Sequence, residues 1–295
     1  MITVRSRLAA TGRRARSALS LVWRTPSGRI GLPIVLVYLL LTLFGPWLGD
    51  WLPHSPTEIP EPLVGYQFLP PSAQFWLGTD QFGRDILSRV LTGATSLVTT
   101  ATAGAVLGII LGAVVGIGSG YKGGRVDEFV MRVMDGLMSF PTLLLALLVL
   151  FTLGPSRVNI AATIGFVSMP SIARVIRSTT LSLKTLEFVG SARLRRESTL
   201  HIMFREILPN VMPVIGVEAS VRLSYAILAV ASLGFLGLGI QPPSPDWGLA
   251  ISQGRRFLIS APWIVLSPMV AVSFLVLGLN LLADGVRQAA RLARE

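Results

Sequence analysis

At 295 residues, 52% hydrophobic and only 14% charged, the chain carries more uninterrupted apolar sequence than a soluble domain can use, so the composition predicts an all-α polytopic membrane protein. The net charge of +11 does not indicate a nucleic-acid binder, because the basic residues are dispersed at the ends of apolar segments and lack interleaved aromatic residues. The absence of cysteine excludes disulfides and thiolate metal ligation, and having only two histidines, His54 and His201, argues against an imidazole-rich metal site.

Residues 1–29 are expected to form a cytoplasmic arm, because they carry seven arginines and no acidic residue. The turn-forming residues Thr25-Pro26-Ser27-Gly28 precede an uncharged run. That run, residues 30–48, is long enough for a first transmembrane helix. A cleaved signal peptide is the alternative, but the run is longer than a typical signal core and no small-x-small cleavage site follows it. Residues 49–89 are then predicted to form an external loop.

The end of this loop predicts a turn followed by a short helix, capped by Thr79 or Asp80. Asp80 and Arg84 are four residues apart, as are Asp85 and Arg89, so each pair can share a helical face. The two aspartates could instead form a metal or acid–base pair. Because no third ligand or base stands nearby, we favour capping.

The second predicted span, residues 90–120, has glycine at every fourth position over its second half. In a helix this spacing makes a stripe along which another backbone can approach closely, either within the subunit or on a partner subunit. The stripe consists of Gly104, Gly108, Gly112, Gly116 and Gly120. Its end could instead be a flexible turn. A phosphate-binding loop does not fit, because the Gly-Lys-Ser/Thr ending and a preceding strand are missing.

A short inner turn is predicted for residues 122–132, followed by a third span over about 129–153. Asp135 lies near the inner end of this span, and Phe140-Pro141 predicts a kink in it. The fourth span is predicted for residues 158–176.

Residues 186–213 are the one long polar interruption of the sequence. From Arg174 to Glu206 there are seven basic and three acidic residues, which places the segment on the cytoplasmic side by the positive-inside rule. Its pattern is helical, with an apolar row expected to end at Pro209 and made of Leu200, Phe204, Ile207 and Leu208. Such an amphipathic hairpin can transmit force to a soluble partner. A cytoplasmic loop that only obeys the charge rule is the alternative.

The fifth predicted span, residues 211–239, contains Glu218 and Arg222. They are four residues apart, so they can pair on one helical face. Charge inside a membrane is costly and therefore suggests a function. Two interpretations remain open: the pair lines a translocation path and meets a zwitterionic solute, or it is a structural ion pair at a helix seam.

A second external loop, residues 239–262, precedes a sixth span at 263–283 and a tail at 285–295. The five later spans form a core over residues 90–284. Of the 26 basic residues, twenty fall on the proposed inner side and five outside, and Arg222 lies within a span. This asymmetry predicts six transmembrane helices with both termini cytoplasmic.

The polar segment resembles the coupling loop of ABC-importer permeases, in which x-Ala-Ala-x-x-x-Gly is followed by Leu-Pro. The matching residues are Gly190-Ser191-Ala192 and Leu208-Pro209, while Arg196 stands where the glycine is expected. Glycine there would permit a tight bend, so arginine is a departure from the pattern. The stretches LGTDQFGRDILSRV, FLGLGIQPPSPDWG and NLLADGVRQA occur in family order and resemble the peptide branch of these permeases.

The resemblance covers residues 77–284 and implies an ABC importer type I permease fold in the bacterial inner membrane. It implies a subunit for import of di- or oligopeptides by alternating access. The implied partners are a homologous second permease forming a heterodimer, two cytoplasmic ATPase subunits or one fused ATPase, and an extracytoplasmic solute-binding protein. ATP and Mg²⁺ would belong to the ATPases, so no catalytic residue, cofactor or metal is expected in this chain, and no nucleic acid.

The resemblance also assigns residues to surfaces. Those implied to couple to the ATPase are Glu187, Gly190, Ser191, Ala192, Arg193, Arg196, Glu197, Leu208 and Pro209. Those in loops implied to face the binding protein are Asp80, Arg84, Asp85, Asp246 and Trp247.

Other functions remain to be weighed. Import of nickel, haem or a sugar by the same architecture stays open, because specificity would rest largely with the binding protein. An ion-coupled secondary transporter would need midplane carboxylates and usually inverted repeats, and only Glu218 offers such a group. An intramembrane hydrolase would need a nucleophile and a base within spans, but both histidines lie outside them.

Overall fold

The computed structural model describes residues 21–51, 65–242 and 244–292. Within these ranges the chain is helical, and the one extended pairing is an isolated bridge between Thr79 and Asp85. Most of the basic arm and the proline-rich start of the first outer loop lie outside the described residues. The helices in chain order are α2 (Pro26–Asp50), α3 (Ile86–Lys122), α4 (Gly124–Met138), α5 (Thr142–Leu153), α6 (Arg157–Leu183), α7 (Glu187–Leu194), α8 (Thr199–His201), the π-helical turn η1 (Ile202–Ile207), α9 (Leu208–Phe235), α10 (Trp247–Gly254), the 3₁₀ turn η2 (Arg255–Phe257) and α11 (Trp263–Leu292).

Five helices are long and apolar enough to cross a membrane: α2, α3, α6, α11 and the continuous helix that runs from α8 through η1 to the end of α9. α4 and α5 pass the same test together, but the chain bends by 88° between them. The described residues thus provide five candidate spans, and six, the predicted number, when the bent pair is counted as one broken span. The tail predicted for residues 285–295 continues α11 as far as Leu292.

The third span differs most from its prediction. The inner turn expected at residues 122–132 is reduced to Gly123, whose φ of +67° is readily available only to glycine, and α4 begins directly after it. The charged residues of this stretch lie on an amphipathic helix, where Arg132 and Glu128 pair at 2.7 Å. The kink expected at Phe140-Pro141 is a complete break, because proline cannot continue the helix that ends at Met138.

α4 is tied to α6 by two ion pairs. Arg177 donates two hydrogen bonds to the carboxylate of Asp127, each of 2.5 Å. Arg174 pairs with Asp135, about two turns further along α4. A bidentate arginine–carboxylate pair fixes both position and rotation of the helix. α4 is thereby held along α6 although few of its own residues are buried.

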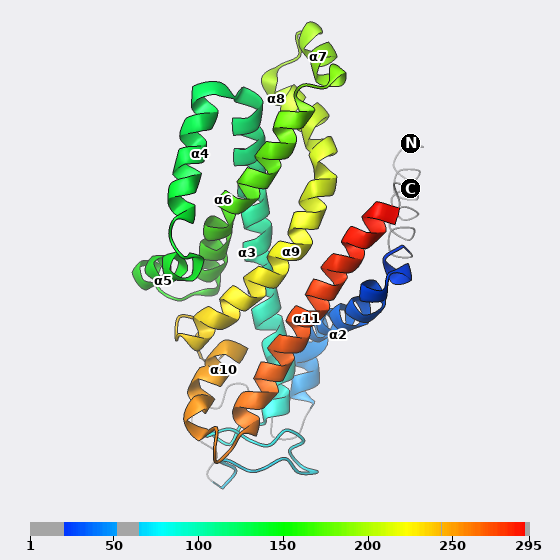
Figure 1. Cartoon of the computed structure of the whole chain (residues 1–295). Helices are drawn as coiled ribbons and strands as arrows, with labels where there is room; N and C mark the ends of the chain where they lie inside the picture. Colours follow the sequence, from blue (N-terminus) through cyan, green and yellow to red (C-terminus); the bar gives the residue numbers. More distant parts are fainter. Residues whose placement is uncertain (1–20, 52–64, 243, 293–295) are drawn as a thin grey trace, which may run out of the picture.

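The helices form an elongated bundle with two distinct ends (Figure 1). α7 lies at one end and α10 at the other, and α3, α6 and α9 run between them. α2 and α11 lie side by side and pack against α3, which also packs along α6. The start of α2 and the end of α11 point toward the α7 end. The largest buried cluster joins α3, α5, α6, α9, α10 and α11, and its fully buried members include Leu97, Leu150, Ile160, Ile227 and Leu233.

Candidate functional site

The coupling segment, residues 186–209, is helical as predicted and folds back on itself at one end of the bundle (Figure 1). Val189 and Ala192 of α7 are fully buried in a cluster with Ile117 of α3, Ile176 of α6 and Ile207 of η1. The buried side of α7 thus packs against η1 and belongs to the same apolar cluster as the ends of α3 and α6.

The outward side of α7 is basic with an apolar centre. Arg193, Arg195 and Arg196 are exposed, and between them Leu194 is 87% exposed. Leu200, in the neighbouring α8, is 63% exposed. The residues implied to couple to the ATPase divide by burial: Glu187, Gly190, Ser191, Arg193, Arg196 and Pro209 are exposed, Glu197 and Leu208 are half-buried, and Ala192 is buried.

The turn after α7 is tight despite the arginine at the expected glycine position. Arg196 has a φ of +59°, in the left-handed region. The N–H of Glu197 bonds to the carbonyl of Ala192 at 3.2 Å, and the N–H of Arg196 bonds to that of Arg193 at 2.9 Å. These two bonds define a Schellman motif, which usually has glycine at the left-handed position. The bend is thus kept, at a conformational cost that glycine would avoid.

The apolar row expected to end at Pro209 is right in its second half and wrong in its first. Ile207 is buried and Leu208 packs beside it, whereas Leu200 and Phe204 are 63% and 59% exposed and Ile202, outside the row, is buried. The helix also does not end at Pro209 but continues into α9, because the chain adopts a π-helical turn just before it. Widening the helix relieves the clash between the proline ring and the preceding turn, and it shifts the buried face by about one residue.

Three side chains around this turn could in principle hold a metal. Atoms of Glu197, His201 and Glu206 that can act as ligands lie within 4.8 Å of one another. A cation already occupies the cluster, since Arg195 lies 2.7 Å from Glu197 and 3.7 Å from Glu206. His201 lies 3.2 Å from the second oxygen of Glu197. We therefore interpret the cluster as an ion-pair network that braces the hairpin.

The glycine stripe of α3 faces α6 along its whole length. A Cβ on Gly108 would lie 2.2 Å from the Oγ of Ser168, and one on Gly116 would lie 2.6 Å from the carbonyl oxygen of Ala173. The other three glycines make comparably close approaches to α6, and all five are buried. The seam thus lies within the subunit. It sets the spacing of two spans that both reach the coupling segment.

Glu218 and Arg222 form the predicted pair, with the Nε of Arg222 3.0 Å from a carboxylate oxygen of Glu218. Both side chains are largely buried, at 17% and 19% exposure, and they lie near the middle of the continuous helix from Thr199 to Phe235. Arg222 also lines a cavity of about 570 Å³ between α3, α5, α6 and α9. Both interpretations of the sequence therefore have a counterpart in the geometry.

Sequence reasoning missed the rest of this cavity. Its polar lining includes Ser168 and Ser171 of α6 and Tyr225 and Ser232 of α9. Isolated hydroxyl residues in apolar spans give no periodic signal, and the helices that bring them together are far apart in the sequence. Arg222, as an intramembrane charge, is the one lining residue that the sequence indicated.

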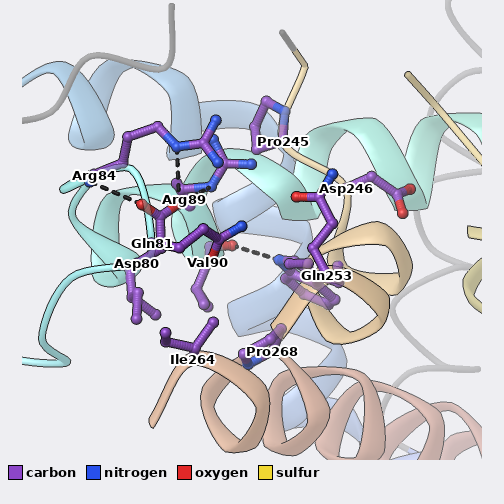
Figure 2. Close-up of a pocket in the computed structure, with 13 residues that line it drawn as sticks. Asp80, Gln81, Arg84, Arg89, Val90, Pro245, Asp246, Gln253, Ile264 and Pro268 are labelled. Carbon is purple, nitrogen blue, oxygen red and sulfur yellow. Dashed lines mark hydrogen bonds and ion pairs between the residues drawn. The ribbon is translucent and has the colours of Figure 1, made fainter. Parts of the chain in front are cut away.

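The end of the bundle that carries α10 holds a buried charged cluster (Figure 2). Arg84 and Arg89 both point to the carboxylate of Asp80, at 2.8 and 3.8 Å. Asp80 also accepts hydrogen bonds from the backbone N–H groups of Phe82 and Arg84. The indole of Trp247, in α10, donates to the carbonyl of Val90 in α3 at 3.0 Å. These contacts fasten α10 and the first outer loop to the beginning of α3.

One prediction for this region is wrong. Within the described residues 65–85 no short helix precedes α3: Asp85 caps α3 itself by accepting from the N–H of Leu87, and Asp80 closes a turn. The residues in the loops implied to face a binding protein have buried side chains. Asp80, Asp85, Asp246 and Trp247 are at most 4% exposed, and the side chain of Arg84 is 12% exposed. Their charges and rings are used inside the chain to hold the outer segments together.

Burial raises the pKa of Asp246, the N-cap of α10, from 3.8 to about 6. Hydrogen bonds from the N–H groups of Leu249 and Gly248, and the charge of Arg89, offset this only in part. Between these two pKa values the unfolded chain releases a proton that the folded chain retains. The folded state therefore loses stability as the pH rises from about 4 to about 6, and the loss is complete above that range.

We expect Asp246→Asn to remove this pH dependence, because asparagine keeps an acceptor for the N–H of Leu249 and does not ionise. The stability of the variant relative to the wild type should rise with pH by up to about 3 kcal/mol, which is about 1.36 kcal/mol for each unit of pKa shift. Thermal unfolding of the purified complex between pH 4.5 and 7.5 measures it. Asp284→Asn, at a side chain that is 54% exposed, is the control. A difference in melting temperature that stays constant with pH would contradict the prediction.

A bundle of apolar spans with an open cavity halfway along a continuous helix, and with a helical hairpin beyond the spans, has the build of a transport permease. Comparison with known proteins identifies the kind. The family model described as "Binding-protein-dependent transport system inner membrane component" matches residues 104–291. The chain belongs to this family, and it is a multi-pass protein of the bacterial inner membrane.

Curated relatives match over most of the chain. It is 36% identical to the dipeptide transport system permease protein DppC of Alkalihalophilus pseudofirmus, over 88% of this chain and 84% of that protein. It is 36% identical to the probable D,D-dipeptide transport system permease protein DdpC of Escherichia coli, over 86% and 83%. It is 39% identical to the glutathione transport system permease protein GsiD of Pectobacterium atrosepticum, over 74% and 73%.

The fold is also found among solved structures. A chain of the inward-facing MetNI methionine ABC transporter superposes with a TM-score of 0.56 at 16% identity, over 68% of this chain and 96% of that one. This likeness shows the fold, which is that of an ABC importer type I permease. Family and fold together indicate a permease that works with ATPase and binding-protein components.

Proposed function

We propose that this chain is one of two permease subunits of an ATP-driven, binding-protein-dependent importer of short peptides. It provides half of the translocation path and no catalytic group, and ATP with Mg²⁺ is bound by the partner ATPases. The termini and the coupling segment lie on the cytoplasmic side, and α10 lies on the outer side. The relatives named above are peptide, D,D-dipeptide and glutathione permeases, which favours a peptide over other solutes.

The observation that carries the proposal is the outward side of α7. An exposed leucine among three exposed arginines, on a helix whose opposite side is buried against three spans, fits a groove on a soluble partner. Closure of the ATPase pair would push α7. Because α7 is anchored to α3, α6 and η1, the push would rock these spans around the cavity.

The rival solutes can be weighed against the cavity. Nickel prefers imidazole or carboxylate ligands, and the residues that line the cavity include no Asp, Glu or His. The cavity instead offers one guanidinium and several hydroxyl groups. This lining favours an organic solute with hydrogen-bonding groups over a bare cation.

Co-purification of the tagged chain in mild detergent tests the proposal, with the ATPase assayed with and without peptide-loaded binding protein. We expect a second permease and the ATPase subunits to be recovered, and hydrolysis to rise when the loaded binding protein is added. A stable lone chain without ATPase activity in several detergents would contradict the coupling role. If ATPase subunits are recovered but respond to another solute and not to peptides, the assignment as an importer permease stands and the assignment of peptides as the solute is rejected.

A further inference from the structure

The guanidinium of Arg222 is only partly used by the protein. Its Nε bonds to Glu218 at 3.0 Å, and among the described residues no acceptor contacts either Nη nitrogen. A guanidinium has five N–H donors arranged in a planar fork. Glu218 therefore neutralises the charge and binds one edge of the fork, while the two terminal nitrogens have no acceptor among the described residues, and Arg222 is one of the residues that line the cavity.

The hydroxyl groups across the cavity have the opposite character. Ser168 donates to the carbonyl of Ile164 at 2.7 Å, Ser171 to that of Ser168 at 3.0 Å, and Ser232 to that of Leu228 at 2.7 Å. Since each hydroxyl proton is already used within its own helix, the oxygens are left as acceptors. The cavity thus presents a donor fork from α9 and hydroxyl acceptors from α6, with a further acceptor, Ser232, on α9 itself.

From this arrangement we infer that Arg222 is a carboxylate-binding residue for the solute in transit, an inference that rests on the proposed function. The terminal nitrogens take the C-terminal carboxylate of a short peptide in a bidentate pair, and the serine oxygens accept from its amine and amide N–H groups. Arginine is suited to this role because its fork matches the two carboxylate oxygens. The pair with Glu218 keeps Arg222 in place when the cavity holds no solute.

This chain contains no cysteine, so a single introduced thiol can report directly on occupancy of the cavity. The test therefore does not need the binding protein. Leu228→Cys places a single thiol on the cavity wall, at a side chain that is 42% exposed, and its labelling by a maleimide reports occupancy. The probes are L-Ala-L-Ala and its C-terminal amide, which differ only in the carboxylate. In the assembled complex we expect the free acid to protect the thiol at about tenfold lower concentration than the amide, because only the acid can form the charge-assisted pair.

Arg222→Gln in the same background should abolish this selectivity, and Ser220→Ala, which removes a hydroxyl group from α9 outside the cavity lining, is the control that should retain it. Arg222→Lys keeps the charge without the fork and should give an intermediate ratio, which serves if the Gln variant does not assemble. Equal protection by acid and amide with Arg222 present, retained selectivity without it, or no protection by either probe would overturn the inference.

Uptake of Ala-Ala by the unmodified complex is measured separately. Uptake without selective protection rejects this site alone, whereas uptake of another solute and no peptide rejects the proposed function.

Discussion

Gly112→Leu is expected to prevent assembly of the complex. A Cβ at Gly112 would lie 2.6 Å from the Cγ2 of Ile172 and 3.2 Å from the backbone nitrogen of Ala173, so α3 and α6 would have to separate. Overpacking of this kind costs about 3 kcal/mol or more, because rigid backbone cannot give way as the end of a flexible side chain can. Both helices also reach the coupling segment, so the displacement would extend to α7. The yield of assembled complex after size-exclusion chromatography measures the effect.

Gly118→Leu is the matched control. Gly118 lies on the same helix, six residues further on, but a Cβ there meets no atom within 4 Å. The two substitutions add the same side chain to the same helix, so they differ only in what faces the glycine. We expect normal assembly for Gly118→Leu. An assembled, active Gly112→Leu complex, or equal loss in both variants, would count against the seam.

The seam was predictable from sequence, and its partner was not. A four-residue glycine period specifies that a backbone approaches, but it does not say which one. The opposing side of α6 also has small residues, among them Ala161, Gly165, Ser168 and Ala173, which the structure places against the stripe. This second stripe could have identified α6, because two small-residue faces on consecutive long spans can pack closely.

The main errors of prediction arose where two local rules conflict. Residues 122–132 were expected to form a turn, but most of them belong to the amphipathic helix α4. Asp127 and Asp135 of this helix have arginine partners on α6. Pro209 indicates a helix end, yet a π-helical turn lets the helix pass it. Both outcomes depend on tertiary contacts that a local pattern does not contain. The burial of the charged cluster around Asp80 was not predicted for the same reason, since the exposure of a loop residue cannot be read from its type.

Arg196 combines an unfavourable backbone conformation with an exposed charge, and two substitutions separate these features. Arg196→Gly removes the left-handed strain, about 1 kcal/mol, and preserves the turn. It should be as stable as the wild type or slightly more so. Arg196→Glu keeps the strain and reverses the charge at the centre of the proposed ATPase contact.

We expect Arg196→Glu to lower the stimulation of the ATPase by loaded binding protein about tenfold while the subunits still assemble, because an acidic group replaces a basic one at a docking surface. Arg196→Gly should lie between Arg196→Glu and the wild type, since it removes one of the three arginine charges at and just after the end of α7 without introducing repulsion. The ratio of stimulated to basal hydrolysis in reconstituted complexes measures both. Wild-type stimulation in Arg196→Glu would move the contact away from this turn. A loss that is as large in Arg196→Gly would mean that the arginine acts through a specific bond and not through the charge of the surface.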